Sequence, residues 1–382
     1  MTRAASGSLT SGSFAACGEL EIDLGAIRAN YEALRARIGS AACGGVVKAD
    51  CYGLGAERIA PVLHEAGCRH FFVAHLEEGL ALRPLLPGAA IYVLNGLPPD
   101  ANAVCADAGL VPVLNAPEQI VLWRAEARRR ERLLPAVLQV DTGMSRLGLS
   151  DAEQAALATD PQGLAGLDMH FIMSHLACAD EPDHSLSEAQ LERFRLAYRL
   201  FAGLPGQSGL RGCFANSAGI FLGTDYHFDC VRPGMALYGL NPLPEQPNPM
   251  RPVVRLSARV VQTRVVSAGA RVGYGYTYTA PRSMRLATLA VGYADGWHRA
   301  LGNRGAVFHA GQRLPIVGRV SMDSMIVDID ATPEGAIRPG DRVELIGPHQ
   351  TADDVATAAG TIGYEILTAL GSRYKRLYRG EA

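Results

Sequence analysis

A lysine that directly follows a short apolar run is the residue of this sequence best suited to covalent chemistry. Residues 44–47 read Gly-Gly-Val-Val, Lys48 follows, and Gly53 and Gly55 break the chain into a loop. This pattern predicts a buried strand that delivers Lys48 to its end. Of 36 Lys and Arg residues, only Lys48 and Lys375 are lysines. A desolvated lysine, unlike arginine, can lose its proton and form a Schiff base with an aldehyde. The alternative is a strand-end lysine whose amine simply reaches solvent.

Polar segments follow four further apolar runs in the same way. They are residues 141–146, which end in Arg146, then His175, then Asn216 and Ser217, and then Arg232-Pro233-Gly234. The carboxyl ends of parallel strands meet at one face of a barrel, so we expect these side chains to gather around Lys48. Each has a plainer alternative on its own, such as Ser217 capping a helix. Their shared position favours a common site.

Eight apolar runs alternate with helical patterns along the first two thirds of the chain. The runs lie at 46–49, 71–74, 91–94, 111–114, 136–140, 169–174, 212–215 and 228–231. Helical spacing of apolar residues recurs at 57–65, 116–128 and 188–201, and Ser187 and Gln190 have the spacing of a capping box for the last helix. Continuous apolar runs separated by helices favour a closed parallel sheet. We therefore predict an α/β protein with an N-terminal (β/α)8 TIM-type barrel.

A proline-rich segment marks the predicted boundary between two domains. Residues 241–253 hold five prolines, which exclude continuous helix or strand and indicate a stiff linker. Beyond it, alternating strands separated by Gly and Pro turns at 253–266, 284–292, 314–330 and 342–346 predict a mostly antiparallel β domain. We assign 1–18 to a flexible leader, 19–250 to the barrel and 251–382 to the β domain. The alternating strand at 19–24 can join either domain.

Bulk composition excludes several classes of function. A net charge of −2 and 48% hydrophobic residues give no bias toward nucleic acid or a membrane surface. The small, polar start lacks the apolar region of a secretion signal. None of the eight cysteines forms a CxxC pair, and Cys213 and Cys230 fall in predicted buried strands. We expect reduced cysteines in a cytoplasmic protein.

Seven motifs now point to one family. Residues 47–53 read VKADCYG, 141–148 read DTGMSRLG, 215–217 read ANS and 231–234 read VRPG. The second domain carries VGYG at 272–275, GYADG at 292–296 and GRVSMD at 318–323. In this order they resemble the alanine racemases, enzymes that use pyridoxal phosphate (PLP) and combine a barrel with a C-terminal β domain. The resemblance covers nearly all residues from Leu20 to Tyr378.

The resemblance implies roles around the cofactor. Lys48 would hold PLP as a Schiff base and also act as one catalytic base. Arg232 would hydrogen-bond the pyridine nitrogen, and His175 would link Arg232 to Tyr274 of the partner subunit. Arg146 would hold the phenolic oxygen of PLP and help place the substrate carboxylate. The phosphate would be cradled by Tyr52, Ser217, Gly234 and Tyr364.

The resemblance also implies a homodimer that shares its active sites. Tyr274 of the partner subunit would be the second base, because racemisation removes a proton from one face of a planar carbanion and returns one to the other. The backbone of the partner's Met322 would meet the substrate carboxylate, and Tyr293 would narrow the entrance. Some relatives carry a carbamylated lysine near Arg146, but this sequence has Gln139 there. We expect its amide to hydrogen-bond Arg146, with chloride or another anion replacing the carbamate charge.

Alternatives to alanine racemisation remain open at this point. The scaffold could racemise a larger or more polar amino acid, such as serine or a basic residue. A non-catalytic PLP-binding protein would need neither the second domain nor Tyr274, and a decarboxylase should carry glutamate in place of Arg232. No metal site is expected, because His170 and His175 are not part of an HExxH motif. A racemase would supply D-alanine for peptidoglycan or degrade it.

Overall fold

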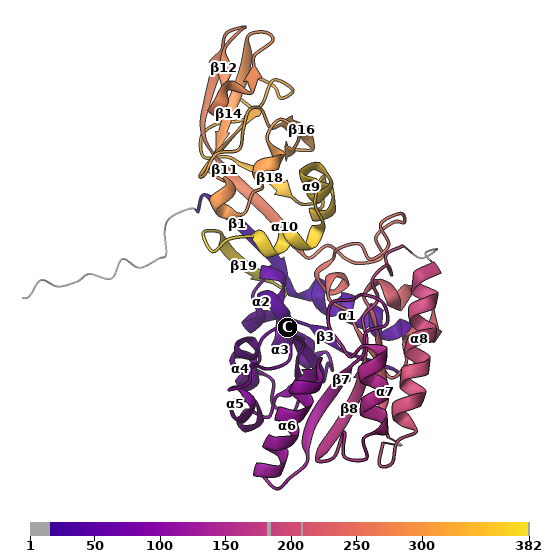
Figure 1. Cartoon of the computed structure of the whole chain (residues 1–382). Helices are drawn as coiled ribbons and strands as arrows, with labels where there is room; N and C mark the ends of the chain where they lie inside the picture. The colour runs from indigo at the N-terminus through magenta and orange to yellow at the C-terminus, as the bar shows by residue number, and fades with distance from the viewer. Residues whose placement is uncertain (1–15, 182–184, 208, 381–382) are drawn as a thin grey trace, which may run out of the picture. The chain divides into compact units, whose positions relative to one another are not determined.

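The computed structural model describes residues 16–181, 185–207 and 209–380, and it divides into two compact units (Figure 1). Among the described residues, one unit comprises 23–253 with 379–380, and the other comprises 16–22 with 254–378. The predicted leader, 1–18, falls mostly outside the described residues. Residues 241–253, which hold the five prolines, contain neither helix nor strand.

A ring of parallel strands forms the first unit. Its sheet has the order β2-β10-β9-β8-β7-β6-β5-β4-β3, and each adjacent pair is parallel. Only Gly44 separates the two end strands β2 and β3, and it donates from its amide to the Val231 carbonyl at 2.9 Å. The sheet therefore closes on itself, which confirms the predicted barrel. The strands are β2 (Ala42–Cys43), β3 (Gly45–Val46), β4 (His70–Val73), β5 (Ala90–Val93), β6 (Val111–Leu114), β7 (Leu134–Gln139), β8 (Leu167–Met173), β9 (Arg211–Asn216) and β10 (Cys230–Arg232).

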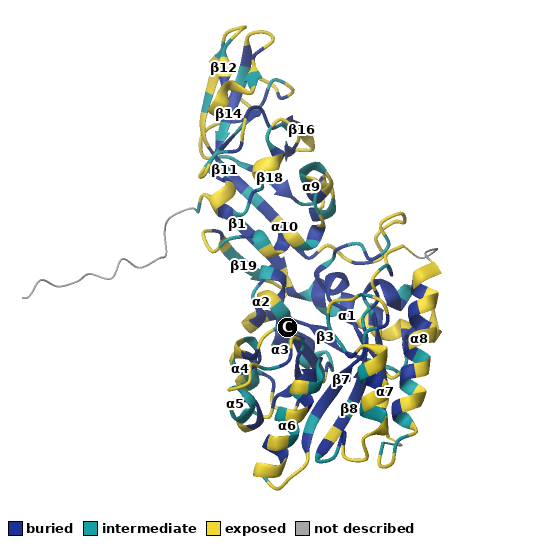
Figure 2. Cartoon of the chain, viewed as in Figure 1, coloured by how far each residue is buried: buried dark blue, intermediate teal, exposed yellow. Residues whose placement is uncertain are grey.

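Helices cover the outer side of this barrel, as expected when both faces of a parallel sheet must be buried (Figure 1). The strands are buried along nearly their whole length, whereas the helices expose one side (Figure 2). The helices are α1 (Leu24–Arg37), α2 (Lys48–Gly53), α3 (Ala56–Glu65), α4 (Leu76–Leu82), α5 (Asn102–Asp107), α6 (Pro117–Arg129), α7 (Asp151–Thr159) and α8 (Ser185–Ala202).

The predicted start of α8 is wrong. The helix already includes Ser185, so Ser187 and Gln190 lie inside it rather than at its cap. Ser187 donates from Oγ to the Cys178 carbonyl at 3.2 Å. Ser187 and Gln190 are both buried. Their polar groups are used for tertiary contacts, which a local capping pattern does not reveal.

The second unit is a mostly antiparallel β structure, as predicted. Its main sheet has the order β16-β15-β18-β11-β1-β19, and β14 and β17 extend it from β11. The first strand of the chain, β1 (Gly18–Asp23), pairs antiparallel with β11 (Val254–Val266). The remaining elements are β12 (Arg271–Val272), β13 (Tyr278–Thr279), β14 (Met284–Leu289), β15 (Ala306–His309), β16 (Gln312–Pro315), β17 (Met325–Asp328), β18 (Arg342–Ile346), β19 (Lys375–Arg379), α9 (Ala352–Ala359) and α10 (Gly363–Ala369).

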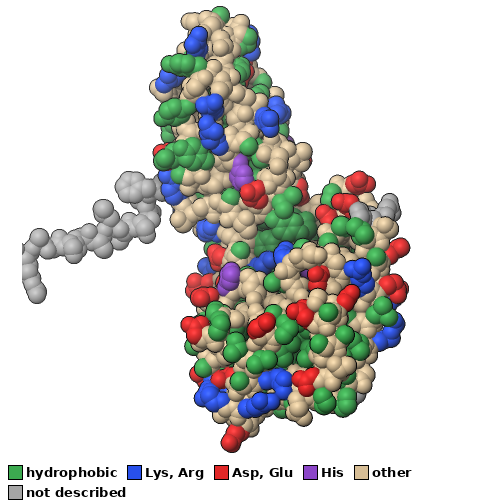
Figure 3. Space-filling model, viewed as in Figure 1, with side chains coloured by type: hydrophobic (Ala, Val, Ile, Leu, Met, Phe, Trp, Pro, Cys, Tyr) green, Lys and Arg blue, Asp and Glu red, His purple; other side chains and the backbone are tan. Residues whose placement is uncertain are grey.

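The surface shows no large region of one charge on the visible face, where acidic and basic side chains are interspersed (Figure 3). Among the described residues, no helix is both long enough and apolar enough to cross a membrane. The same residues contain no group of three His, Cys, Asp or Glu side chains arranged to hold a metal ion.

Candidate active site

Lys48 begins a left-handed turn at the carboxyl end of β3. The residues that follow it, Ala49 to Tyr52, have φ angles of 51, 54, 54 and 58°. None of the four is glycine, and each such residue costs roughly 1–2 kcal/mol relative to the right-handed form. The predicted strand at 46–49 is therefore too long, because the chain leaves the sheet at Val47. Strain of this kind is retained mainly where it positions functional groups.

Two carboxylates hold this strained turn in place. Glu78 of α4 accepts from the backbone N–H of Ala49 at 2.6 Å and from that of Ala74 at 2.6 Å. Asp50 accepts from the backbone N–H of Ala56 at 2.7 Å, which ties the turn to the start of α3. The contacts compensate the backbone strain and fix the position of Lys48.

The amine of Lys48 lies in a cationic environment. Its pKa is lowered first by burial and then by the neighbouring charge of Arg146, while Glu78 opposes the shift and Arg232 adds to it. Both burial and nearby cations disfavour the charged ammonium. Lys48 is thus closer to the neutral, nucleophilic state than an ordinary lysine.

Arg232, the last residue of β10, is buried and aims its donors at the neighbouring strand ends. Its Nη1 donates to the Cys213 carbonyl at 2.8 Å, and its Nη2 donates to the Ser174 carbonyl at 2.6 Å. Nη2 also lies 3.3 Å from His175 Nδ1. Since a guanidinium can only donate, His175 Nδ1 must accept, and the imidazole proton must lie on Nε2.

His175 is consequently held in its neutral form. Burial lowers its pKa most, followed by the charges of Arg232, Arg146 and Lys48, and together they bring it to about 3. The lowered pKa of His175 has its charged neighbours as a cause, so the four residues lie near one another although they come from separate segments of the sequence. The barrel brings together Lys48, Arg146, His175 and Arg232.

A second group of predicted residues forms a close-packed cradle beside β10. The Ser217 hydroxyl accepts from the backbone N–H of Gly234 at 2.9 Å and from that of Ala236 at 3.3 Å. A Cβ added to Gly234 would lie 2.3 Å from the Tyr52 hydroxyl oxygen, so only glycine fits. The ring of Tyr52 packs against Tyr238 with 4.7 Å between centroids. Hydroxyls and backbone N–H groups of this kind suit an anionic group such as phosphate.

The expected contact between Gln139 and Arg146 is not formed. Gln139 is buried and donates from Nε2 to the Leu147 carbonyl at 3.3 Å. Arg146 is exposed and makes no hydrogen bond or ion pair within the part of the chain that the structure describes. The Gln139 amide therefore bonds to the backbone next to Arg146 and not to the Arg146 guanidinium.

The remaining predicted residues belong to the second unit. Tyr274 is 73% exposed, Met322 53% and Tyr293 43%. Tyr293 donates from its backbone N–H to the Ser321 carbonyl at 3.0 Å, and Ala294 donates to the Met322 carbonyl at 2.9 Å. These bonds place Tyr293 and Met322 side by side. Tyr364 lies in α10 and is half-buried.

Sequence reasoning missed two residues that position this site. Glu78 was overlooked, although its spacing from His75 is that of a capping box for α4. Gln190 was assigned to the wrong role. Its Nε2 donates to the His175 carbonyl at 3.0 Å and to Thr142 Oγ1 at 3.3 Å, and its Oε1 accepts from the Ala177 N–H at 2.9 Å. It thereby joins the loops that carry Arg146 and His175.

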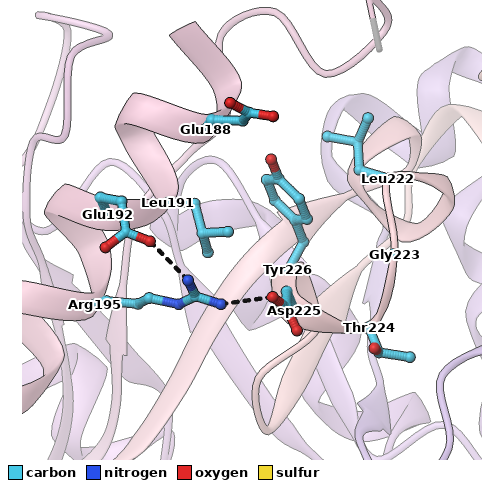
Figure 4. Close-up of a pocket in the computed structure, with 9 residues that line it drawn as sticks. All are labelled: Glu188, Leu191, Glu192, Arg195, Leu222, Gly223, Thr224, Asp225 and Tyr226. Atoms are coloured by element: carbon cyan, nitrogen blue, oxygen red, sulfur yellow. Dashed lines mark hydrogen bonds and ion pairs between the residues drawn. The ribbon is translucent and has the colours of Figure 1, made fainter. Parts of the chain in front are cut away.

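A pocket of about 480 Å³ lies elsewhere, between α8 and residues 222–226 (Figure 4). Arg195 spans it with ion pairs to Glu192 at 2.7 Å and to Asp225 at 2.8 Å. None of the site residues predicted from the sequence lines this pocket. It is separate from the Lys48 site.

The barrel gathers a half-buried lysine, a buried arginine beside a half-buried histidine, and a hydroxyl cradle at the carboxyl ends of its strands. Together with the antiparallel second unit, this defines a two-domain barrel enzyme whose chemistry lies at that face. Two family models match the chain, namely the alanine racemase N-terminal domain over residues 22–242 and the alanine racemase C-terminal domain over residues 253–378. The chain belongs to the alanine racemase family, whose members are isomerases, and this confirms the resemblance drawn from the motifs.

Individual relatives agree with this assignment. A catabolic alanine racemase of Agrobacterium fabrum is 54% identical over 95% of this chain and 92% of its own length. An alanine racemase of Brucella abortus is 52% identical over 95% of this chain and 94% of its own length. The crystal structure of alanine racemase from Bartonella henselae with covalently bound pyridoxal phosphate has a TM-score of 0.91 and 45% identity, and covers 96% of this chain and 100% of that one.

Proposed function

We propose that the protein interconverts L-alanine and D-alanine with PLP held on Lys48. The observation that carries this proposal is the position of Lys48 directly after β3, in a chain of the alanine racemase family. Burial and the charge of Arg146 lower the pKa of Lys48, which favours the amine that condenses with an aldehyde, and the arginines suit the anionic substituents of PLP. When bound, PLP supplies the electron sink that makes the α-proton of an amino acid removable.

The cofactor fits the residues that the barrel presents. Arg232 would donate to the pyridine nitrogen and cannot accept from it, which would favour an unprotonated ring nitrogen. Many PLP enzymes place a carboxylate there, which keeps the nitrogen protonated and the sink strong. The arginine should thus shorten the lifetime of the carbanion and limit side reactions. For the phosphate we assign Tyr52, Ser217, Gly234 and Tyr364.

Two bases on opposite faces of the substrate carbon complete the proposal. Lys48 Nζ takes or returns the proton on one face, because its lowered pKa makes the neutral amine available. Tyr274 of the partner subunit does so on the other face. His175 carries its proton on Nε2, so it can donate to the phenolic oxygen of that tyrosine and favour its ionised form. Arg146 and the partner's Met322 backbone hold the substrate carboxylate, and Tyr293 restricts the entrance to small substrates.

We assign the protein to the cytoplasm as a homodimer with shared active sites. The large exposure of Tyr274 and Met322 in a single chain supports this arrangement, because a catalytic tyrosine needs a surrounding that excludes water. The racemase would supply D-alanine for peptidoglycan or degrade alanine, and growth of a deletion strain with and without D-alanine separates the two roles.

Chemical trapping followed by chiral analysis tests the proposed reaction. Borohydride reduction should fix PLP to Lys48, and peptide mapping should find no label on Lys375, the other lysine of the chain. The unreduced holoenzyme should then racemise alanine faster than serine or arginine. A label on Lys375 contradicts the assignment of the cofactor. A labelled Lys48 without racemisation of any amino acid in the panel would instead indicate a silent PLP-binding protein.

Mixed dimers test the contribution of the partner. Chains carrying Lys48→Ala and Tyr274→Phe should each be inactive as homodimers. When refolded together, about half of the dimers are mixed, and each mixed dimer holds one intact site, so about a quarter of the wild-type sites should return. Activity that stays at the level of the parent homodimers would place Lys48 and Tyr274 of one site on the same chain.

A further inference from the structure

The buried guanidinium of Arg232 lacks a conventional counter-charge. Its side chain is 4% exposed, and its hydrogen-bond acceptors include two backbone carbonyls and a neutral imidazole. Within the described ranges, no carboxylate lies within ion-pair distance of Arg232. A buried charge without an opposite charge costs several kcal/mol, so such groups are normally paired. We therefore looked for a counter-charge in the remaining polar neighbour of Arg232.

That neighbour is a cysteine beneath the guanidinium. Arg232 Nη1 lies 3.2 Å from Cys213 Sγ, which is short for a nitrogen–sulfur hydrogen bond. Cys213 lies in β9 and Cys230 lies opposite it in β10, in register across the parallel pair. Both thiols are free and fully buried. The Cys230 thiol donates to the Val231 carbonyl at 3.6 Å and so keeps its proton, whereas the Cys213 sulfur faces the guanidinium.

We propose that Cys213 is a thiolate that supplies the counter-charge of Arg232 and acts as its positioning residue, while the neighbouring Cys230 remains a thiol. The arrangement fixes the guanidinium through one charged and three neutral acceptors, and it cancels most of the positive charge that Arg232 would otherwise present. The inference rests on the proposed function in one respect only, namely that Arg232 faces the pyridine nitrogen of PLP.

The electrostatics of the pair agree with this geometry. Burial alone would raise the pKa of Cys213, but the neighbouring Cys230 thiol and the charge of Arg232 outweigh it and lower the pKa to about 7. The pKa of Cys230 is raised well above its ordinary value, first by the proximity of Cys213 and then by burial. Other titratable or charged groups near the pair are Arg211 of β9, Tyr92 of β5 and Cys43 of β2.

A difference titration of the holoenzyme tests the thiolate directly. Ultraviolet absorbance of wild type minus Cys213→Ser should show one thiolate per chain, with a midpoint near pH 7. Thiols common to both proteins cancel in the difference. Cys105→Ser is the matched control, because Cys105 is also fully buried but its pKa is raised to about 12. Wild type minus this control should show no thiolate at neutral pH.

The same variants report on the positioning of Arg232. Loss of a charge-assisted hydrogen bond should weaken PLP binding by about tenfold in Cys213→Ser. Cys105→Ser should bind PLP as the wild type does. Identical thiolate absorbance in wild type and Cys213→Ser overturns the inference.

A second variant decides the case if Cys213→Ser does not fold. Cys230→Ala keeps Cys213 but removes the neighbouring thiol that lowers its pKa, so the thiolate midpoint should rise by about one pH unit. An unchanged midpoint would also overturn the inference. Either result leaves the proposed racemase untouched, because that proposal fails only if the wild-type holoenzyme does not racemise alanine.

Discussion

The barrel contains two clusters of titratable side chains that differ in where they stand on the strands. The upper cluster consists of Lys48, Arg146, His175 and Arg232, which lie at or after strand ends. The lower cluster consists of His70, Tyr92 and His170, which lie within β4, β5 and β8. Both clusters contain a histidine with a lowered pKa. A lowered pKa alone therefore does not distinguish a catalytic group from a structural one.

The difference lies in how the polar groups are satisfied. In the lower cluster the Tyr92 hydroxyl bridges His70 Nδ1 at 3.0 Å and His170 Nδ1 at 3.3 Å, and the ring of Tyr92 stacks on Phe72. This cluster is a packed layer of the barrel interior. In the upper cluster Arg146 and Arg232 lower the pKa of both Lys48 and His175, so both of these groups are shifted toward their neutral forms. A site with this electrostatic bias suits an anionic ligand.

Removing one member of each cluster should separate the two roles. Lys48→Ala should lower kcat/KM by at least about a thousandfold, the scale of losing a covalent and acid–base group. Its free energy of unfolding should stay within about 0.5 kcal/mol of wild type when both are compared without PLP, because burial and Arg146 already disfavour the charged amine.

Tyr92→Phe is the counterpart, with the ring kept and the hydroxyl removed. It should leave kcat/KM within about twofold of wild type but lower the free energy of unfolding by about 1–3 kcal/mol, because two half-buried histidines lose a partner. Enzyme assays and urea unfolding measure both quantities. If Tyr92→Phe reduces activity as severely as Lys48→Ala, the lower cluster takes part in the chemistry and the distinction between the clusters is wrong.

The upper cluster could be predicted from sequence because it follows a simple rule. Polar residues directly after apolar runs mark the active face of a barrel, and Lys48, His175 and Arg232 all obey it. The alternation of apolar runs with helical patterns was likewise enough to predict the barrel. In the second unit, β18 was predicted with its observed bounds. Local patterns carry this information because strand ends are marked by a change from apolar to polar residues.

What could not be predicted depends on tertiary contacts. Lys48 looked like a residue at the end of a longer strand, because nothing local indicates that Ala49 to Tyr52 turn left-handed. Gln190 looked like a helix cap, because its three partners lie on other loops. Tyr92 looked like an ordinary residue of an apolar strand, since only barrel closure brings His170 to its hydroxyl. A one-dimensional pattern contains none of these pairings.

The smallest expected effect concerns pH and the lower cluster. Burial, then the charges of Arg211 and His170, lower the pKa of His70 from 6.5 to about 4. The unfolded chain binds a proton near pH 6.5 while the native His70 stays neutral, so this stability is present above pH 6.5 and is lost as pH falls toward 4. The shift corresponds to at most about 3 kcal/mol.

His70→Gln should remove this dependence while keeping a polar group near Tyr92. Above about pH 6.5 the variant should show only a pH-independent loss of stability, because His70 is neutral in both states of the wild type there. Between about pH 6.5 and about pH 4, its urea unfolding midpoint should fall less steeply than that of the wild type. Parallel profiles for the two proteins would mean that His70 does not stay neutral in the folded barrel. In that case the lower cluster would take up charge as pH falls, and its contrast with the cationic upper cluster would hold only near neutral pH.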